Sequence, residues 1–77
     1  MTPKEFQTLV YIHQYIQTHG YSPTYTEIAN ARSNKSIGYI TRVISNLHDA
    51  GLIDRQPAAK RNIILTDKGE KLAKISQ

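Results

Sequence analysis

The sequence predicts a small α+β domain that is mainly helical, with one β-hairpin before its last helix. Apolar residues recur at steps of three and four over several stretches, helix-starting residues precede these stretches, and two strand-like runs flank a loop over residues 57–61. A chain of 77 residues has room for one domain. We therefore expect residues 1–77 to form one unit, with its core over 2–66 and a terminal helix over 67–77.

The first helix is expected over about residues 3–18. Thr2 can cap it, Pro3 suits the first helical position, and Glu5 can reach back to the cap amide. Gly20 then offers a left-handed stop. The apolar stripe between these ends is made of Phe6, Leu9, Ile12, His13 and Ile16, and Val10 widens it.

A helix–turn–helix arrangement is expected next. Pro23 keeps the residue before it extended, and Thr24 with Glu27 forms a second capping box that starts a short helix over about 25–31. Its inward residues are Ile28 and Ala29. After a polar turn, Ser36 can cap a longer helix over about 37–49, which ends at Gly51. The apolar face of this third helix consists of Ile40, Val43, Ile44 and Leu47.

A hairpin and a last helix complete the chain. Residues 52–56 and 62–66 are expected as its two strands, with a basic loop between them. The last helix is expected over about 67–75, with Leu72 and Ile75 on one side and Gly69 as a weakening residue. A helix–turn–helix followed directly by a hairpin is the order of a winged helix, in which the hairpin is the wing.

The charge distribution favours a polyanionic partner. The net charge is +4, and residues 28–48 hold Arg32, Lys35 and Arg42 but no carboxylate. The outward face of the third helix carries hydroxyls, an amide and an arginine, which are groups that bond to base edges and phosphates. The alternative interpretation is that this is an ordinary solvated polar face. The outward face of the third helix consists of Gly38, Tyr39, Thr41, Arg42, Ser45 and Asn46.

Several other functions are not expected. The chain has no cysteine, so a disulfide framework and a thiolate zinc site are excluded. His13, His19 and His48 lack the spacing of a helical zinc pair, and His13 is expected in the core. No nucleophile elbow or Gly-rich phosphate loop occurs, so we expect neither an enzyme nor a cofactor. No apolar run approaches the ~20 residues of a membrane span and no signal peptide is present, which predicts a cytoplasmic protein.

The segment from Gly20 to Ala29 reads G-Y-S-P-T-Y-T-E-I-A and resembles the DNA-binding domain of the LexA repressor family, whose pattern here is G-x-x-P-T-x-x-E-I-A. The resemblance continues through Ser36 and Leu47 to Gly51-Leu52-Ile53 and to Arg61 before Ile63. It covers about residues 2–65 and implies a winged helix whose third helix enters the major groove while the wing touches phosphates.

The resemblance also implies the residues of the site. Base-contacting positions fall on Ser36, Gly38, Tyr39, Thr41 and Arg42. The family usually has Pro, Asn, Ala and two Glu at positions 37, 38, 39, 41 and 42, so that only Ser36 is retained and a target other than the LexA operator is expected. Amides at the start of the second helix are natural phosphate donors. The expected contacts to the DNA backbone are Thr24, Tyr25, Thr26, Lys35, Ser45, Lys60 and Arg61.

The expected function is sequence-specific binding of double-stranded DNA by a small, repressor-like transcription regulator of bacterial, phage or plasmid origin. A winged-helix adaptor for protein partners and a non-specific nucleic-acid binder are the alternatives. A weak homodimer on a palindromic site is expected, with residues 67–77 as its contact unless their apolar face packs on the first helix. LexA carries a further Ser-Lys peptidase domain, which this chain does not reach; the chain is expected to be either a complete small protein, as its helical ending favours, or an excised domain.

Overall fold

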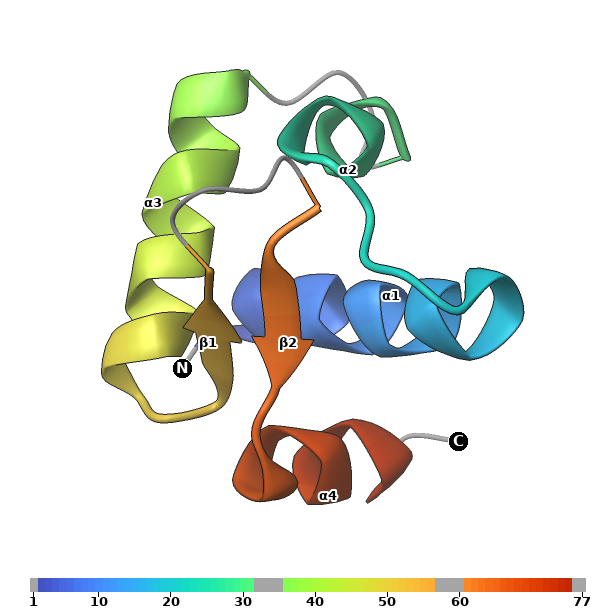
Figure 1. Cartoon of the computed structure of the whole chain (residues 1–77). Coiled ribbons are helices and arrows are strands. Elements are labelled where there is room, and N and C mark those ends of the chain that lie inside the picture. Colours follow the sequence, from blue (N-terminus) through green and yellow to red (C-terminus); the bar gives the residue numbers. More distant parts are fainter. Residues whose placement is uncertain (1, 32–35, 57–60, 76–77) are drawn as a thin grey trace.

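The computed structural model describes residues 2–31, 36–56 and 61–75. It contains the helices α1 (Pro3–His19), α2 (Tyr25–Ala31), α3 (Ile37–Asp49) and α4 (Asp67–Ile75) and the strands β1 (Ile53–Arg55) and β2 (Ile63–Leu65) (Figure 1). The strands pair antiparallel, with Asp54 opposite Ile64. The predicted winged helix-turn-helix, mainly helical with one hairpin, is confirmed, although both strands are shorter than expected.

The predicted helix starts are confirmed by their hydrogen bonds. Thr2 Oγ1 accepts from the Glu5 amide at 3.2 Å, and Glu5 Oε1 accepts from the Thr2 amide at 3.0 Å, which completes the capping box. Ser36 Oγ accepts from the Tyr39 amide at 3.1 Å and begins α3. Gly20 ends α1 with φ 80°, a left-handed conformation that glycine adopts without a Cβ penalty.

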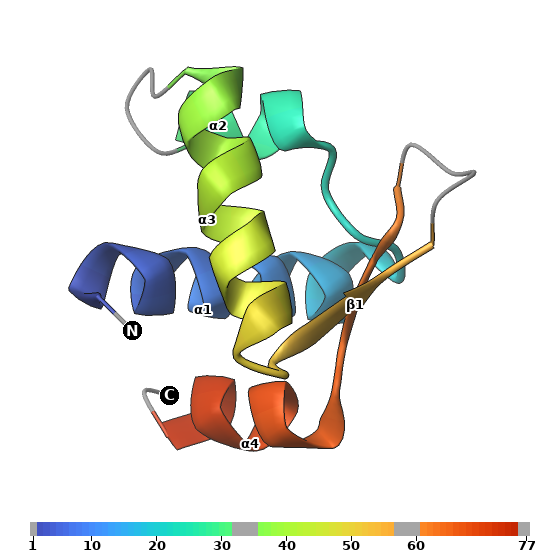
Figure 2. The ribbon, with the colours of Figure 1, turned by 90° about the vertical axis from the view of Figure 1, so that its left-hand side faces the viewer.

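One core joins the helices and the hairpin. α3 crosses α1, α2 packs against α3, and the hairpin extends to one side of α3 (Figure 2). All the residues predicted to face inward on α2 and α3 are buried. The core consists of Leu9, Ile12, Ile28, Ala29, Ile40, Val43, Ile44, Leu47, Leu52, Ile53, Ile63 and Ala73.

The buried face of α4 differs from the prediction. Leu72 and Ile75 were expected on one side of this helix, either packed on α1 or free for a second copy; 76% of Ile75 is exposed, and Gly69 and Ala73 are the buried residues. α4 lies so close to the α3–β1 connection that a Cβ at position 69 would overlap the carbonyl group of Leu52. Gly69 therefore permits this close packing, where the sequence had suggested only a weak point.

The start of α4 is tied to the same connection. Thr66 Oγ1 accepts from the Gly69 amide at 3.1 Å and donates to the carbonyl of Gly51 at 2.7 Å. The Thr66 amide donates to the Leu52 carbonyl at 3.1 Å. Within the described ranges, every helix is too short or too polar to cross a membrane.

Candidate nucleic-acid interface

The first half of α3 presents an exposed polar face. Figure 2 views this helix from the front. Ser36, Gly38, Thr41 and Arg42 are exposed, as their helical spacing predicted. The Thr41 hydroxyl donates to the carbonyl of Ile37 at 2.9 Å, which leaves its lone pairs able to accept a bond. Arg42 forms no ion pair with any of the residues that the structure describes. This half of the helix therefore offers hydroxyls and an exposed cation at its surface.

Tyr39 and Ser45 are less accessible than predicted. Tyr39 was expected to face outward, but it is half-buried and packs against the core. Position 39 precedes the inward residue Ile40 and lies one turn before Val43, so its large ring reaches the edge of the core. Ser45 is also half-buried. Only the outer edge of Tyr39 can reach a ligand on this face.

The second half of the same face lies beside a carboxylate from another helix, that of Glu5 on α1. Asn46 Nδ2 donates to Glu5 Oε2 at 2.7 Å, so the start of α1 lies beside this part of α3. The hydrogen bond from the Thr2 amide, followed by that from Asn46, lowers the pKa of Glu5 below its ordinary value. The Glu5 carboxylate therefore places negative charge beside Asn46 in the second half of α3.

The start of α2 lies against the hairpin. Thr24, Tyr25, Thr26 and Asn62 line a common concave surface. The predicted second capping box is present, since the Thr24 amide donates to Glu27 Oε1 at 2.8 Å and the Glu27 amide donates to Thr24 Oγ1 at 3.1 Å. Because the Thr24 amide is already bonded, a phosphate at this end would meet the amides of Tyr25 and Thr26.

Arg61 is held by the protein itself. Its guanidinium donates to both carboxylate oxygens of Glu27, at 2.8 and 3.2 Å, and to the carbonyl of Ser22 at 2.9 Å. It also lies over the ring of Tyr21, 4.6 Å from the centroid. The bonds from Arg61 and then from the Thr24 amide lower the pKa of Glu27 to about 2. Lys35 and Lys60, the other predicted phosphate contacts with long side chains, lie outside the described residues.

Two further residues hold this group together and were not predicted. Ser22 is 4% exposed, and its hydroxyl accepts from the Ile63 amide at 3.3 Å. The hydroxyl of Tyr15 donates to Glu27 Oε1 at 3.2 Å. Their partners lie 41 and 12 residues away in the sequence, so no local pattern marks them. In the described ranges, no three histidine or acidic side chains gather as metal ligands.

The comparisons with known proteins agree with this geometry. The family model described as the LexA DNA binding domain matches residues 1–62 of this chain. The LexA repressor of Limosilactobacillus reuteri is 35% identical over 66 residues, covering 86% of this chain and 32% of the repressor. The LexA repressor of Syntrophotalea carbinolica is 32% identical over 75 residues, covering 97% of this chain and 37% of the repressor. The chain thus spans about a third of the length of these relatives, and it belongs to the LexA DNA-binding domain family.

Proposed function

We propose that the chain binds double-stranded DNA sequence-specifically, with α3 in the major groove, and acts as a small repressor-like regulator of transcription in the bacterial cytoplasm. The observation that carries this proposal is the exposed first half of α3, which is rich in hydroxyls, contains Arg42 and has no carboxylate. The family of this chain is named for DNA binding. In helix-turn-helix proteins, the second helix of the motif is the recognition helix and presents such a face to the major groove.

The proposed base contacts come from the start of α3. Arg42 is long enough to fork onto the O6 and N7 atoms of guanine, the Ser36 hydroxyl can donate to a base edge, and the Thr41 hydroxyl can accept from one. Gly38 allows close approach to the DNA, and the exposed edge of Tyr39 packs on a thymine methyl or a sugar. Because these positions depart from the usual family pattern, we propose that the recognised sequence differs from the LexA operator.

The proposed backbone contacts flank the recognition helix. The amides of Tyr25 and Thr26, with the hydroxyl of Thr24, face a phosphate on one side of the groove. Ser45, Lys35 and Lys60 complete the set. Such contacts fix the position of the protein on the duplex and carry no sequence information.

Selection of binding sites from random duplex DNA, followed by footprinting, tests this proposal. We expect one recurrent motif and a protected stretch centred on it, with affinity that falls steeply as salt rises. A matched control is Lys71→Ala, which removes an exposed charge on α4, away from α3. Binding without a motif would instead support the non-specific alternative, and no binding to any duplex would support the adaptor.

A further inference from the structure

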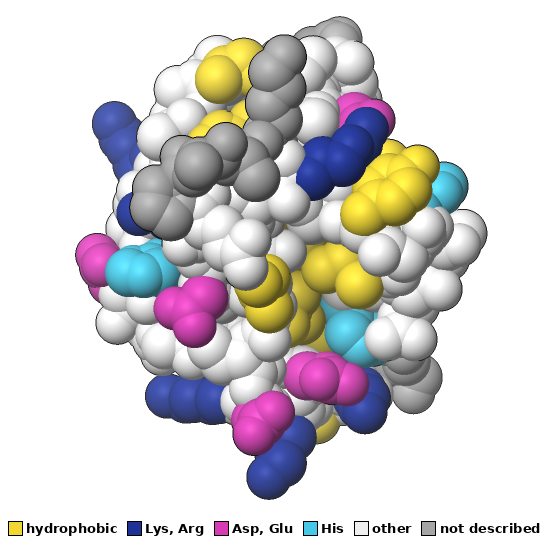
Figure 3. Space-filling view, in the orientation of Figure 1, with side chains coloured by type: hydrophobic (Ala, Val, Ile, Leu, Met, Phe, Trp, Pro, Cys, Tyr) yellow, Lys and Arg dark blue, Asp and Glu magenta, His cyan; other side chains and the backbone are white. Residues whose placement is uncertain are grey.

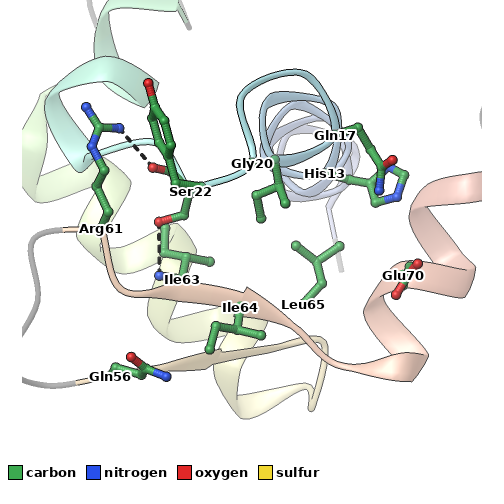
Figure 4. A pocket seen from close by; sticks show the side chains of 12 residues that line it. His13, Gln17, Gly20, Ser22, Gln56, Arg61, Ile63, Ile64, Leu65 and Glu70 are labelled. Atoms are coloured by element: carbon green, nitrogen blue, oxygen red, sulfur yellow. Dashed lines mark hydrogen bonds between the residues drawn. The ribbon is translucent and has the colours of Figure 1, made fainter.

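The side chain of Arg61 reaches from the hairpin to three other segments of the chain. It contacts Glu27 on α2, the Ser22 carbonyl and the Tyr21 ring in the connection between α1 and α2, and the hydroxyl of Tyr15 on α1 at 3.3 Å. Figure 4 shows Arg61 directed at this connection, just before β2. Arg61 thereby joins the hairpin to Glu27 and Ser22, which precede it by 34 and 39 positions in the sequence.

These contacts occupy the groups with which an arginine would grip a phosphate. Both terminal nitrogens of the guanidinium donate to the carboxylate of Glu27, and one face of the group covers Tyr21. The carboxylate also neutralises the charge that would attract a polyanion. A move of Arg61 onto a phosphate would break all of these contacts and leave Glu27 ionised close to the DNA.

Ser22 adds a second tie between the same two segments. Its buried hydroxyl accepts from the Ile63 amide at the first residue of β2, while its carbonyl accepts from Arg61 (Figure 4). Arg61 and Ser22 also border a cavity of about 350 Å³ whose apolar floor is visible as a hollow in Figure 3. These polar bonds add to the pairing with β1 and the burial of Ile63 in holding the start of β2, and they are the bonds that tie it to the segment before α2 and to α2.

We propose that Arg61 is a positioning residue: together with Glu27 and Ser22 it clamps the hairpin against the start of α2, so that both meet the DNA backbone in a fixed geometry, and it does not itself contact a phosphate. This rests on the proposed function. It reassigns the residue that the family resemblance implies as a backbone contact. The clamp neutralises no phosphate, whereas a phosphate contact adds the release of one counterion to the salt dependence of binding.

Four variants separate these two roles. Arg61→Ala removes both the clamp and the charge, and Arg61→Lys keeps the charge but loses the bidentate geometry. Glu27→Gln breaks the ion pair and keeps an acceptor for the Thr24 amide, and the double variant Glu27→Gln/Arg61→Ala tests whether the two residues act together. Lys71→Ala is the control, because Lys71 is an exposed cation on α4 that forms no ion pair with any described residue.

The measurement is the dissociation constant for the selected duplex at several salt concentrations, well below each variant's unfolding temperature. We expect Arg61→Ala and Arg61→Lys to weaken binding by similar factors, about 3- to 30-fold, with the slope of log affinity against log salt unchanged. In the Glu27→Gln background, Arg61→Ala should have little further effect. Circular dichroism establishes that each variant is folded.

The opposite pattern would overturn the clamp. If Arg61 contacts a phosphate, Arg61→Lys should keep the salt slope of the parent protein, Arg61→Ala should flatten the slope by about 0.9, and Glu27→Gln should tighten binding by releasing the arginine. A parent protein that binds no duplex would overturn the proposed function as well. A parent protein that binds with the pattern of a phosphate contact would overturn this inference alone.

Discussion

Arg42 and Arg61 both belong to the predicted interface, but the structure gives them different surroundings. Arg42 is exposed on α3 and has no ion-pair partner among the described residues, whereas Arg61 is bound to Glu27, Ser22 and Tyr21. A side chain that reads DNA must exchange water for bases without first breaking strong bonds within the protein. We therefore predict that Arg42, rather than Arg61, gives sequence specificity.

Replacing Arg42 by alanine should remove the preference at one base pair. An arginine forked onto guanine contributes ~1–3 kcal/mol of discrimination against the other bases. We expect Arg42→Ala to relax the selected motif at one position while binding to unrelated duplexes falls only by the loss of one charge. Repeating the site selection with the variant measures this. An unchanged motif would show that Arg42 does not read a base.

The ion pair of Glu27 should make stability depend on pH in the acid range. The pKa of Glu27 is lowered from 4.5 to about 2, so the folded state favours its ionised form. Its contribution to stability is complete above pH 4.5 and is lost as the pH falls from 4.5 towards 2. Glu27→Gln has no such titration.

Thermal unfolding of the parent protein and of Glu27→Gln should be followed from neutral pH to pH 2. We expect the parent protein to unfold at the higher temperature near neutrality and the two midpoints to converge below pH 4.5. Glu5 also has a lowered pKa, but it is present in both proteins and cancels in the comparison. A difference that stays constant over the whole range would contradict the assignment to Glu27.

Among the elements, α4 depends most on close backbone contact. It is short, and it is tied to the connection between α3 and β1 through Thr66 and through the approach of Gly69 to Leu52. Its largest apolar contacts are the buried Ala73 and the half-buried Leu72. Because α4 has so few contacts with the rest of the protein, its stability depends on each of them.

Replacing Gly69 by alanine should destabilise the fold despite the higher helix propensity of alanine. The added methyl group would overlap the Leu52 carbonyl, and such overpacking costs about 1–3 kcal/mol. The matched control is Gly38→Ala, where a Cβ meets only Ser36 Oγ at 3.9 Å. That change should be neutral or stabilise the protein by up to ~1 kcal/mol. Urea unfolding measures both, and equal stability of the two variants would contradict the close packing at Gly69.

For the assembly of the whole molecule, α4 leaves little apolar surface for a second copy. The structure packs Ala73 and Leu72 of α4 on the core, which favours the alternative that this face serves its own chain. Ile75 is the large apolar residue of α4 that remains exposed. One such side chain cannot sustain a stable dimer, because specific interfaces bury about 800 Å² on each partner.

We therefore predict a monomer in dilute solution that pairs on a palindromic site. Two half-sites related by a two-fold axis bring two copies close enough for weak contacts to act. Sedimentation of the free protein, and of its complexes with half-site and full-site DNA, measures the stoichiometry. Ile75→Lys should leave the free protein unchanged and reduce the cooperativity on full-site DNA. A tight dimer without DNA would contradict the prediction.

The sequence by itself determined the local elements of this protein. The capping boxes at Thr2 and Thr24, the cap at Ser36 and the stop at Gly20 involve residues within four positions of one another, so they can be read along the chain. Helical periodicity also placed the core face of α3 and the exposure of Ser36, Gly38, Thr41 and Arg42 correctly. Together these patterns were enough for the winged helix.

Only the tertiary structure decided how the elements meet. The bonds between Arg61 and Glu27 and between Asn46 and Glu5 join residues 34 and 41 positions apart, and the fit of Gly69 against Leu52 joins two different elements. Neither distance along the chain nor periodicity specifies such contacts, because they depend on the angles at which helices pack. For the same reason the family resemblance implied Arg61 as a contact to DNA, while the folded protein pairs it with its own carboxylate.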